Sequence, residues 1–174
     1  MSPRDKIVPP ILIIAYGNPL RCDDGIAWRA AEALERKFPR SQVEIHRLQQ
    51  LAPEIADDLR QRDLVVFVDA ACLDRGDQGQ AGEIRRHEIS GSDPTDRPPS
   101  QFTHVYSPAR VLDLARELYR RTPKAITISV TGQHFEHGES LSPYVANALP
   151  ELIATIERLV QEALQRASTT KDTN

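Results

Sequence analysis

An apolar run, a polar loop and an amphipathic segment follow one another near the start of this chain and predict a strand, a loop and a helix. The run Ile11-Leu-Ile-Ile14 is apolar at every position, which is typical of a parallel strand covered on both faces. The segment 26–38 repeats its apolar residues at helical spacing. A strand followed directly by such a helix favours an α/β fold.

The same alternation continues along the rest of the chain. Strands are expected at 11–16, 43–48, 64–68, 82–89 and 125–130, and helices at 24–37, 53–59, 108–121 and 143–165. The polar residues 167–174 are expected to be a frayed tail. The sequence therefore predicts a single α/β domain over residues 1–174, with its core at about 8–166. We expect three layers: a mostly parallel, twisted sheet of about five strands, in flavodoxin- or phosphorylase-like order, sandwiched by helices.

Composition argues against several classes of function. The formal net charge of −3 disfavours non-specific binding to nucleic acid. No apolar run approaches the roughly 20 residues of a membrane helix, and the polar start of the chain does not match a signal peptide. Two cysteines, Cys22 and Cys72, make neither a disulfide framework nor a zinc motif, and we expect them to be small buried residues. A cytoplasmic protein that binds neither membrane nor nucleic acid is expected.

Three polar residues stand where the predicted strands and helices meet their loops. Asp24 lies in the loop after the first strand, Asp69 directly follows Leu64-Val-Val-Phe-Val68, and His104 precedes the helix start at Ser107-Pro108. If the first and third strands are neighbours, their carboxyl ends meet where open α/β sheets bind ligands. Two carboxylates and one imidazole suit a divalent first-row metal and leave positions open for water or substrate.

Each of these residues also has a simpler interpretation. Asp24 could stabilise the positive end of the following helix, Asp69 could form a turn, and His104 could be structural or solvated. Asp23 could cap locally, or could orient a ligand or a water molecule. The motifs of serine, cysteine and zinc hydrolases and of phosphate-binding loops are absent from the sequence. The residues alone therefore indicate an α/β domain with a candidate metal site and no specific reaction.

Four motifs follow one another along the chain: Gly17-Asn-Pro-Leu-Arg-Cys-Asp-Asp-Gly25, Val68-Asp-Ala70, Thr103-His-Val-Tyr-Ser-Pro108 and Gly138-Glu-Ser-Leu-Ser-Pro143. In this order they resemble the motifs of the hydrogenase maturation proteases, the endopeptidases that process the large subunit of nickel–iron hydrogenases. The resemblance extends from the first predicted strand to the last helix. One departure is Ala27, which stands where many relatives have a glycine.

The resemblance implies a function, a metal and a partner. It implies that Asp24, Asp69 and His104 form the catalytic site and engage nickel that arrives bound to the hydrogenase large-subunit precursor. The protease then cuts a short C-terminal extension from that precursor, acting as a monomer that pairs with it transiently. Two alternatives stay open: a non-catalytic, metal-binding chaperone of hydrogenase maturation, and a nucleotide- or small-ligand-binding α/β domain.

Overall fold

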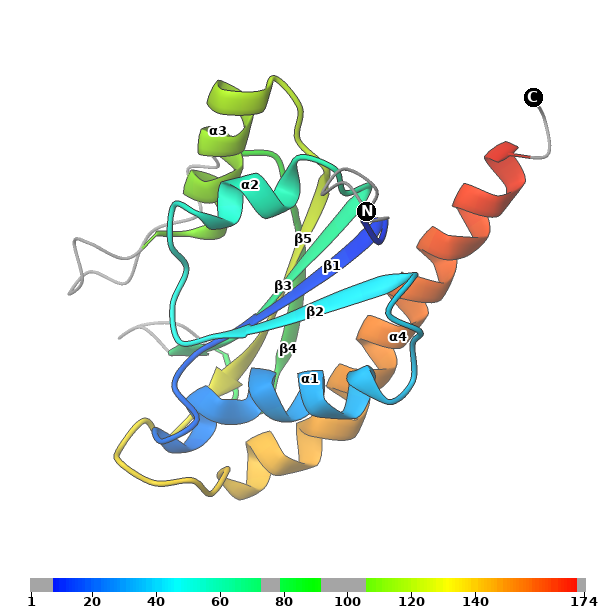
Figure 1. Cartoon of the computed structure of the whole chain (residues 1–174). Coiled ribbons are helices and arrows are strands. Elements are labelled where there is room, and N and C mark those ends of the chain that lie inside the picture. The colour runs from blue at the N-terminus through cyan, green and yellow to red at the C-terminus, as the bar shows by residue number, and fades with distance from the viewer. Residues whose placement is uncertain (1–7, 73–78, 92–105, 172–174) are drawn as a thin grey trace, which may run out of the picture.

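The computed structural model describes residues 8–72, 79–91 and 106–171 and shows a five-stranded sheet between two layers of helices (Figure 1). The strands are β1 (Ile11–Tyr16), β2 (Val43–Leu48), β3 (Leu64–Cys72), β4 (Ile84–Ile89) and β5 (Lys124–Gly132). The helices are the 3₁₀-helix η1 (Cys22–Gly25), α1 (Ile26–Glu35), α2 (Ile55–Leu59), α3 (Pro108–Tyr119) and α4 (Pro143–Lys171).

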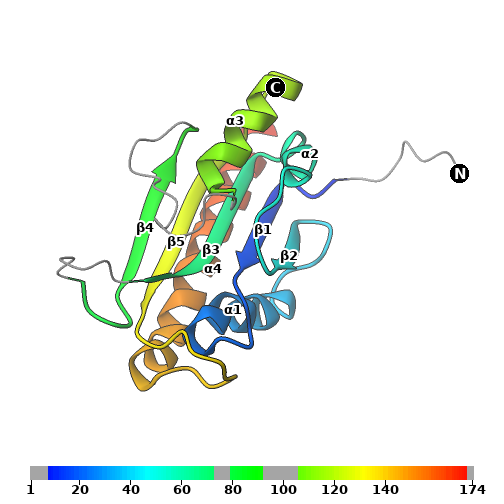
Figure 2. The same ribbon diagram turned by 90° about the vertical axis from the view of Figure 1, so that its left-hand side faces the viewer.

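The strand order is β2-β1-β3-β5-β4, which can be followed across the sheet in Figure 2. Strands β2, β1, β3 and β5 run parallel, and β4 pairs antiparallel with β5 at one edge. From β1 the chain continues to β2 on one side of it and then returns to β3 on its other side. The direction in which strands are added to the sheet therefore reverses between β1 and β3. The predicted α/β class and the neighbouring positions of the first and third strands are therefore confirmed.

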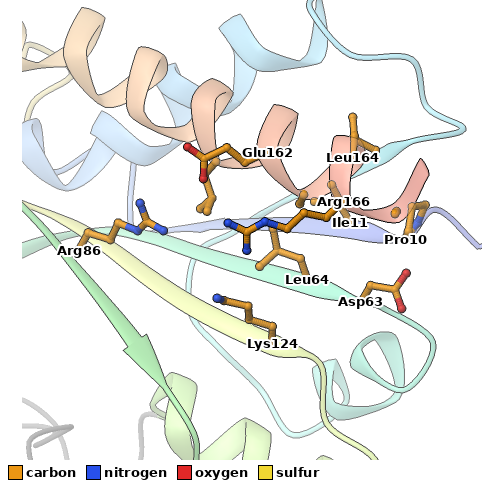
Figure 3. Close-up of a pocket in the computed structure, with 12 residues that line it drawn as sticks. Pro10, Ile11, Asp63, Leu64, Arg86, Lys124, Glu162, Leu164 and Arg166 are labelled. Atoms are coloured by element: carbon orange, nitrogen blue, oxygen red, sulfur yellow. The ribbon is translucent and has the colours of Figure 1, made fainter. Parts of the chain in front are cut away.

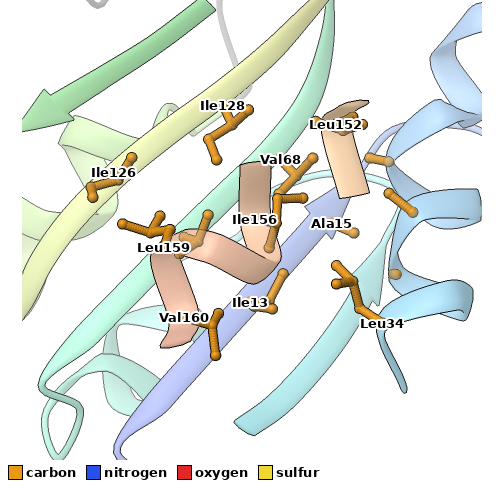
Figure 4. Packing of buried hydrophobic residues seen from close by; sticks show 14 of the residues in the cluster. Ile13, Ala15, Leu34, Val68, Ile126, Ile128, Leu152, Ile156, Leu159 and Val160 are labelled. Atoms are coloured by element: carbon orange, nitrogen blue, oxygen red, sulfur yellow. The ribbon is translucent and has the colours of Figure 1, made fainter. Parts of the chain in front are cut away.

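Two apolar clusters cover the two faces of the sheet. On one face, Ile13, Val68 and Ile128 pack against Ile156 of α4 and Leu34 of α1 (Figure 4). On the other face, the side chains of β1 and β3 pack against α2 and α3. Because successive residues of a strand point to opposite faces, a sheet buried on both sides requires uninterrupted apolar runs such as the one in β1.

Helix α4 is longer than the sequence predicts. We expected it to end near residue 165 and the tail 167–174 to fray, whereas the helix continues to Lys171. The hydroxyls of Ser168 and Thr169 donate to the carbonyls of Leu164 and Gln165, each at 3.1 Å, and no glycine or proline follows Pro150 to stop the helix. Despite its length, neither α4 nor any other helix within the described ranges is long and apolar enough to cross a membrane.

Arg62 is a buried cation that anchors the edge strand β2. Its side chain is 4% exposed and donates to the carbonyl of Pro9 at 2.7 Å and to Oε2 of Glu44 at 2.6 Å. Burial alone would raise the pKa of Glu44, but the hydrogen bonds from Arg62 and His46 outweigh it and lower the pKa below its ordinary value of 4.5. Ionised Glu44 therefore stabilises the folded state.

The Glu44→Gln variant is expected to lose stability at neutral pH but not at acid pH. The folded-state pKa of Glu44 lies below the unfolded value, so its contribution is complete above pH 4.5 and disappears as the pH falls through the lower folded pKa. We expect a loss of about 1 kcal/mol, or about 2–4 °C in Tm, at pH 7. Thermal unfolding across pH would measure it, with Glu32→Gln, which breaks an exposed pair with Arg36, as the control. An equal loss at every pH would contradict this account.

Candidate functional site

The candidate site lies at the carboxyl ends of β1 and β3, where the strand order reverses. The pairing of β1 with β3 ends at Ala15 and Val68, while β3 continues along β5 as far as Cys72. Asp69 is thus the first residue of β3 beyond its pairing with β1. The 3₁₀-helix η1, which carries Asp24, also lies against β3. The fold therefore brings the segments of Asp24 and Asp69 to the same end of the sheet, as the sequence predicts.

Asp24 is held against the turn that follows β1. Its Oδ2 accepts a hydrogen bond from the backbone N–H of Asn18 at 2.8 Å, and a side chain at Gly17 would collide with it. Burial raises the pKa of Asp24, and the Asn18 hydrogen bond and the charge of Arg21 offset this only in part. A partly desolvated carboxylate of this kind would be stabilised by an approaching metal cation.

Asp69 is half-buried, and its Oδ2 accepts a hydrogen bond from the hydroxyl of Tyr16 at 3.0 Å. Tyr16 packs against the apolar cluster on the α2 and α3 face, so it links that core to the site. We did not predict this role for Tyr16. A tyrosine that ends an apolar strand carries no motif, and only the register of β1 on β3 places it beside Asp69.

The predicted end of the third strand was wrong. We expected the strand to stop at Val68 with Asp69 after it, whereas Asp69 lies inside β3. The reason is the neighbouring strand: the β5 ladder continues from Ser129 to Gly132 and pairs with Asp69 through Cys72. Tertiary pairing here overrides the polar residue that suggested a loop.

His104 lies outside the described residues, so its role as a third ligand stays a prediction. The helix start after it is confirmed, because α3 begins at Pro108 and Oγ of Ser107 accepts a hydrogen bond from the N–H of Arg110 at 3.3 Å. Within the part of the chain that the structure describes, no three His, Cys, Asp or Glu side chains are grouped to hold a metal. Asp24 and Asp69 could supply only part of a ligand set, and the rest would have to come from His104, a substrate or water.

The two adjacent carboxylates differ in environment. Asp23 is fully buried, whereas Asp24 is only half-buried. Burial alone would raise the pKa of Asp23, but hydrogen bonds from the backbone of His134, Ser142 and Gln133 and from the Ser142 hydroxyl lower it overall. The fold therefore directs Asp23 into the protein and leaves Asp24 as the partly exposed carboxylate of the pair.

The cysteines do not follow the prediction that both are small buried residues. Cys22 is half-buried, and it adopts a left-handed backbone conformation with φ of 47°. Cys72 is exposed because it is the last residue of β3, where the sheet reaches the surface. Sequence periodicity predicts on which face of a strand a residue lies. It does not predict where along the strand the residues become exposed to solvent.

A cavity of about 480 Å³ lies at the opposite end of the sheet, beneath the C-terminal half of α4 (Figure 3). Its lining includes Ile11, Leu64 and Lys124, which are the first residues of β1, β3 and β5. It includes neither Asp24 nor Asp69. Because ligands in open α/β sheets bind at the carboxyl ends of the strands, we do not assign this cavity to the candidate site.

Comparison with known proteins gives consistent results. No protein-family model matches the chain. The chain is 27% identical over 162 residues to the hydrogenase 2 maturation protease of Escherichia coli K12, an alignment that covers 90% of this chain and 87% of the relative.

Solved structures of such enzymes share the fold. The hydrogenase maturating endopeptidase HybD from E. coli superposes with a TM-score of 0.70 at 25% identity, covering 88% of this chain and 93% of that one. The nickel–iron hydrogenase maturation protease HycI from Thermococcus kodakarensis gives a TM-score of 0.64 at 24% identity, covering 87% and 92%. The second likeness concerns the fold alone.

Proposed function

We propose that this chain, whose resemblance to the hydrogenase maturation proteases is confirmed in sequence and in fold, is an endopeptidase that removes the C-terminal extension of a nickel–iron hydrogenase large-subunit precursor. The likeness to the E. coli hydrogenase 2 maturation protease over 90% of the chain carries this conclusion. The placement of Asp24 and Asp69 beside the switch point of the sheet supports it, because that is where α/β folds bind their ligands.

Within this proposal, Asp24, Asp69 and His104 are the catalytic residues and the protein's ligands to nickel. The nickel is part of the substrate: it arrives inside the precursor and is recognised there. This accords with the small ligand set that Asp24 and Asp69 provide, since the precursor would contribute ligands of its own. A bound divalent ion can polarise a carbonyl or activate a water molecule for peptide hydrolysis. The aspartates would hold the ion and thereby orient the precursor for cleavage.

The partner is the hydrogenase large-subunit precursor, and we propose that the protein meets it as a monomer in the cytoplasm. The two cysteines of the sequence make no disulfide framework, which accords with a reducing compartment. We propose no role for nucleic acid or for a membrane. The formal net charge of −3 disfavours binding to nucleic acid.

A processing assay tests the proposal. The purified protein is incubated with a large-subunit precursor, with and without nickel, and the intact mass of the precursor is followed. Loss of a short C-terminal peptide only from the nickel-loaded precursor is the expected result. Binding without a change of mass would indicate a maturation chaperone, and stabilisation by nucleotide without any response to nickel would indicate a ligand-binding domain. If several nickel-loaded precursors are neither bound nor cut, the proposal is wrong.

A further inference from the structure

We infer that Asp23 is a positioning residue, which fixes the direction of its neighbour Asp24 by locking η1 onto the segment between β5 and α4. We call the side chain of Asp23, together with Gln133, His134 and Ser142, the Asp23 latch. The inference rests on the proposed function, because it concerns the orientation of Asp24 in that site.

Four donors from the other side of the latch hydrogen-bond to the carboxylate of Asp23. Its Oδ2 accepts from the N–H groups of Gln133 and His134, at 2.8 and 2.9 Å, and from the Ser142 hydroxyl at 2.9 Å. Its Oδ1 accepts from the N–H of Ser142 at 2.6 Å. Three of the four donors therefore meet Oδ2 and one meets Oδ1, and all four come from the segment between β5 and α4. Asp23 is thus a buried structural acceptor and is not placed to ligate a metal or to contact a substrate.

Backbone bonds extend the latch along both segments. The N–H of Asp23 donates to the carbonyl of His134 at 3.0 Å, and the N–H of Cys22 donates to the carbonyl of Gly138 at 2.7 Å. In return, the N–H of Gly138 donates to the carbonyl of Leu20 at 2.8 Å. The two segments therefore lie side by side, as Figure 1 shows below the sheet. Through these bonds, the segment after β5 holds the Asp24 loop in its conformation.

The latch determines where Asp24 points because the two aspartates share one short turn. In η1 the side chain of Asp23 is turned into the protein, and the left-handed conformation of Cys22 directs the chain into this turn. The carboxylate of Asp24 is then left facing Gly17 and the N–H of Asn18. If Asp23 lost its partners, the four hydrogen bonds that hold η1 through this side chain would be gone, and Asp24 would lose its fixed direction.

Ser142 has a different role from the one the sequence suggests. Ser142 stands directly before a proline at a helix start, a pattern that in Ser107 and Pro108 goes with a capping hydroxyl. The helix does begin at Pro143, but the Ser142 hydroxyl donates to Asp23. Ser142→Ala removes this one bond and keeps the backbone N–H that also serves Asp23, so it is the mildest way to weaken the latch.

Two variants, Ser142→Ala and Asp23→Asn, test the inference. Asp23→Asn places an amide N–H₂, which cannot accept a hydrogen bond, against at least one of the donors. Ser168→Ala, which removes a hydroxyl from the far end of α4, is the matched control. Three quantities are measured: cleavage kinetics with nickel-loaded precursor, hydrogen exchange of the Asn18 amide, and exchange of the β3 amides. The Asn18 amide reports directly on Asp24, because it donates to the Asp24 carboxylate.

For Ser142→Ala we expect the Asn18 amide to exchange at least about tenfold faster and kcat to fall about tenfold, with KM and the β3 amides unchanged. Asp23→Asn should have a larger effect in the same direction; if it does not fold, Ser142→Ala carries the test. Folded variants with wild-type kcat and wild-type Asn18 exchange would overturn the inference. So would a rise in KM at constant kcat, or equally faster exchange at Asn18 and in β3. If the wild type cleaves no precursor, the proposed function fails, but the exchange measurements still decide whether Asp23 positions Asp24.

Discussion

Asp24→Asn is expected to abolish precursor cleavage and to leave the fold intact. Asparagine keeps the size of the side chain and can still accept the hydrogen bond from Asn18, but it loses the charge that would bind a cation. Because we propose that Asp24 contacts the metal, its loss should exceed the 10–100-fold effects typical of residues that only orient a metal ligand, so we expect cleavage to fall by more than about 100-fold. Cleavage of a nickel-loaded precursor, followed by intact mass, measures it.

The stability of the same variant provides an independent check. Because burial raises the pKa of Asp24, its charge opposes folding at neutral pH, and removal of that charge should leave Tm unchanged or raise it. The gain should shrink as the pH falls, since the wild-type carboxyl is then protonated as well. Asp63→Asn is the control and should cleave normally, because Asp63 is exposed and directly precedes β3, at the end of the sheet opposite the site. A folded Asp24→Asn protein with wild-type cleavage would remove Asp24 from the site.

Gly17→Ala is expected to damage both stability and cleavage. Gly17 has φ of +137°, a backbone conformation that residues with a side chain rarely adopt. A Cβ atom at this position would lie 2.4 Å from the backbone oxygen of Asp24 and 3.0 Å from its Oδ1. The chain must shift at the point where it supports Asp24. We expect a loss of about 1–3 kcal/mol, or roughly 2–10 °C in Tm, and cleavage reduced at least about tenfold below the melting range.

Gly91→Ala is the matched control for this variant. Gly91 also has a positive φ, of +60°, and it follows β4 at the end of the sheet opposite the site, where a Cβ atom would meet the side chains of Asp113 and Arg116 in α3. Its loss of stability should be similar, but its cleavage rate per folded molecule should stay normal. If both variants lose the same fraction of activity per folded molecule, the effect at Gly17 is one of general stability and not of the site.

The sequence predicts the strands and helices well because their apolar patterns are local. All five strands and four of the helices lie where periodicity places them, with differences at their ends. The ends are harder, because they depend on neighbours: β3 continues past Asp69 only since β5 pairs with it there. The same holds for the turns: Gly17 has a positive φ, whereas Gly25, in the same motif, adopts φ of −81°.

The candidate site is predictable only where a motif or a strand end marks it. Asp24 and Asp69 follow apolar runs and can be found from the sequence, but Tyr16 and Ser142 cannot. Tyr16 reaches Asp69 through the register of two strands, and Ser142 reaches Asp23 across 119 residues of chain. Such contacts depend on tertiary packing, which leaves no periodic signal at either residue.

The bonds between the Asp24 loop and the segment before α4 also bear on when the protein becomes active as it folds. They join residues 110 to 119 positions apart, and contacts of such separation form late because a long loop must close first. During synthesis, the first half of the sheet can assemble while the partners of Asp23 have not yet been translated. The orientation of Asp24 is therefore completed only when Ser142 has joined the fold, so an unfinished chain would carry the aspartate without the geometry that we propose it needs for cleavage.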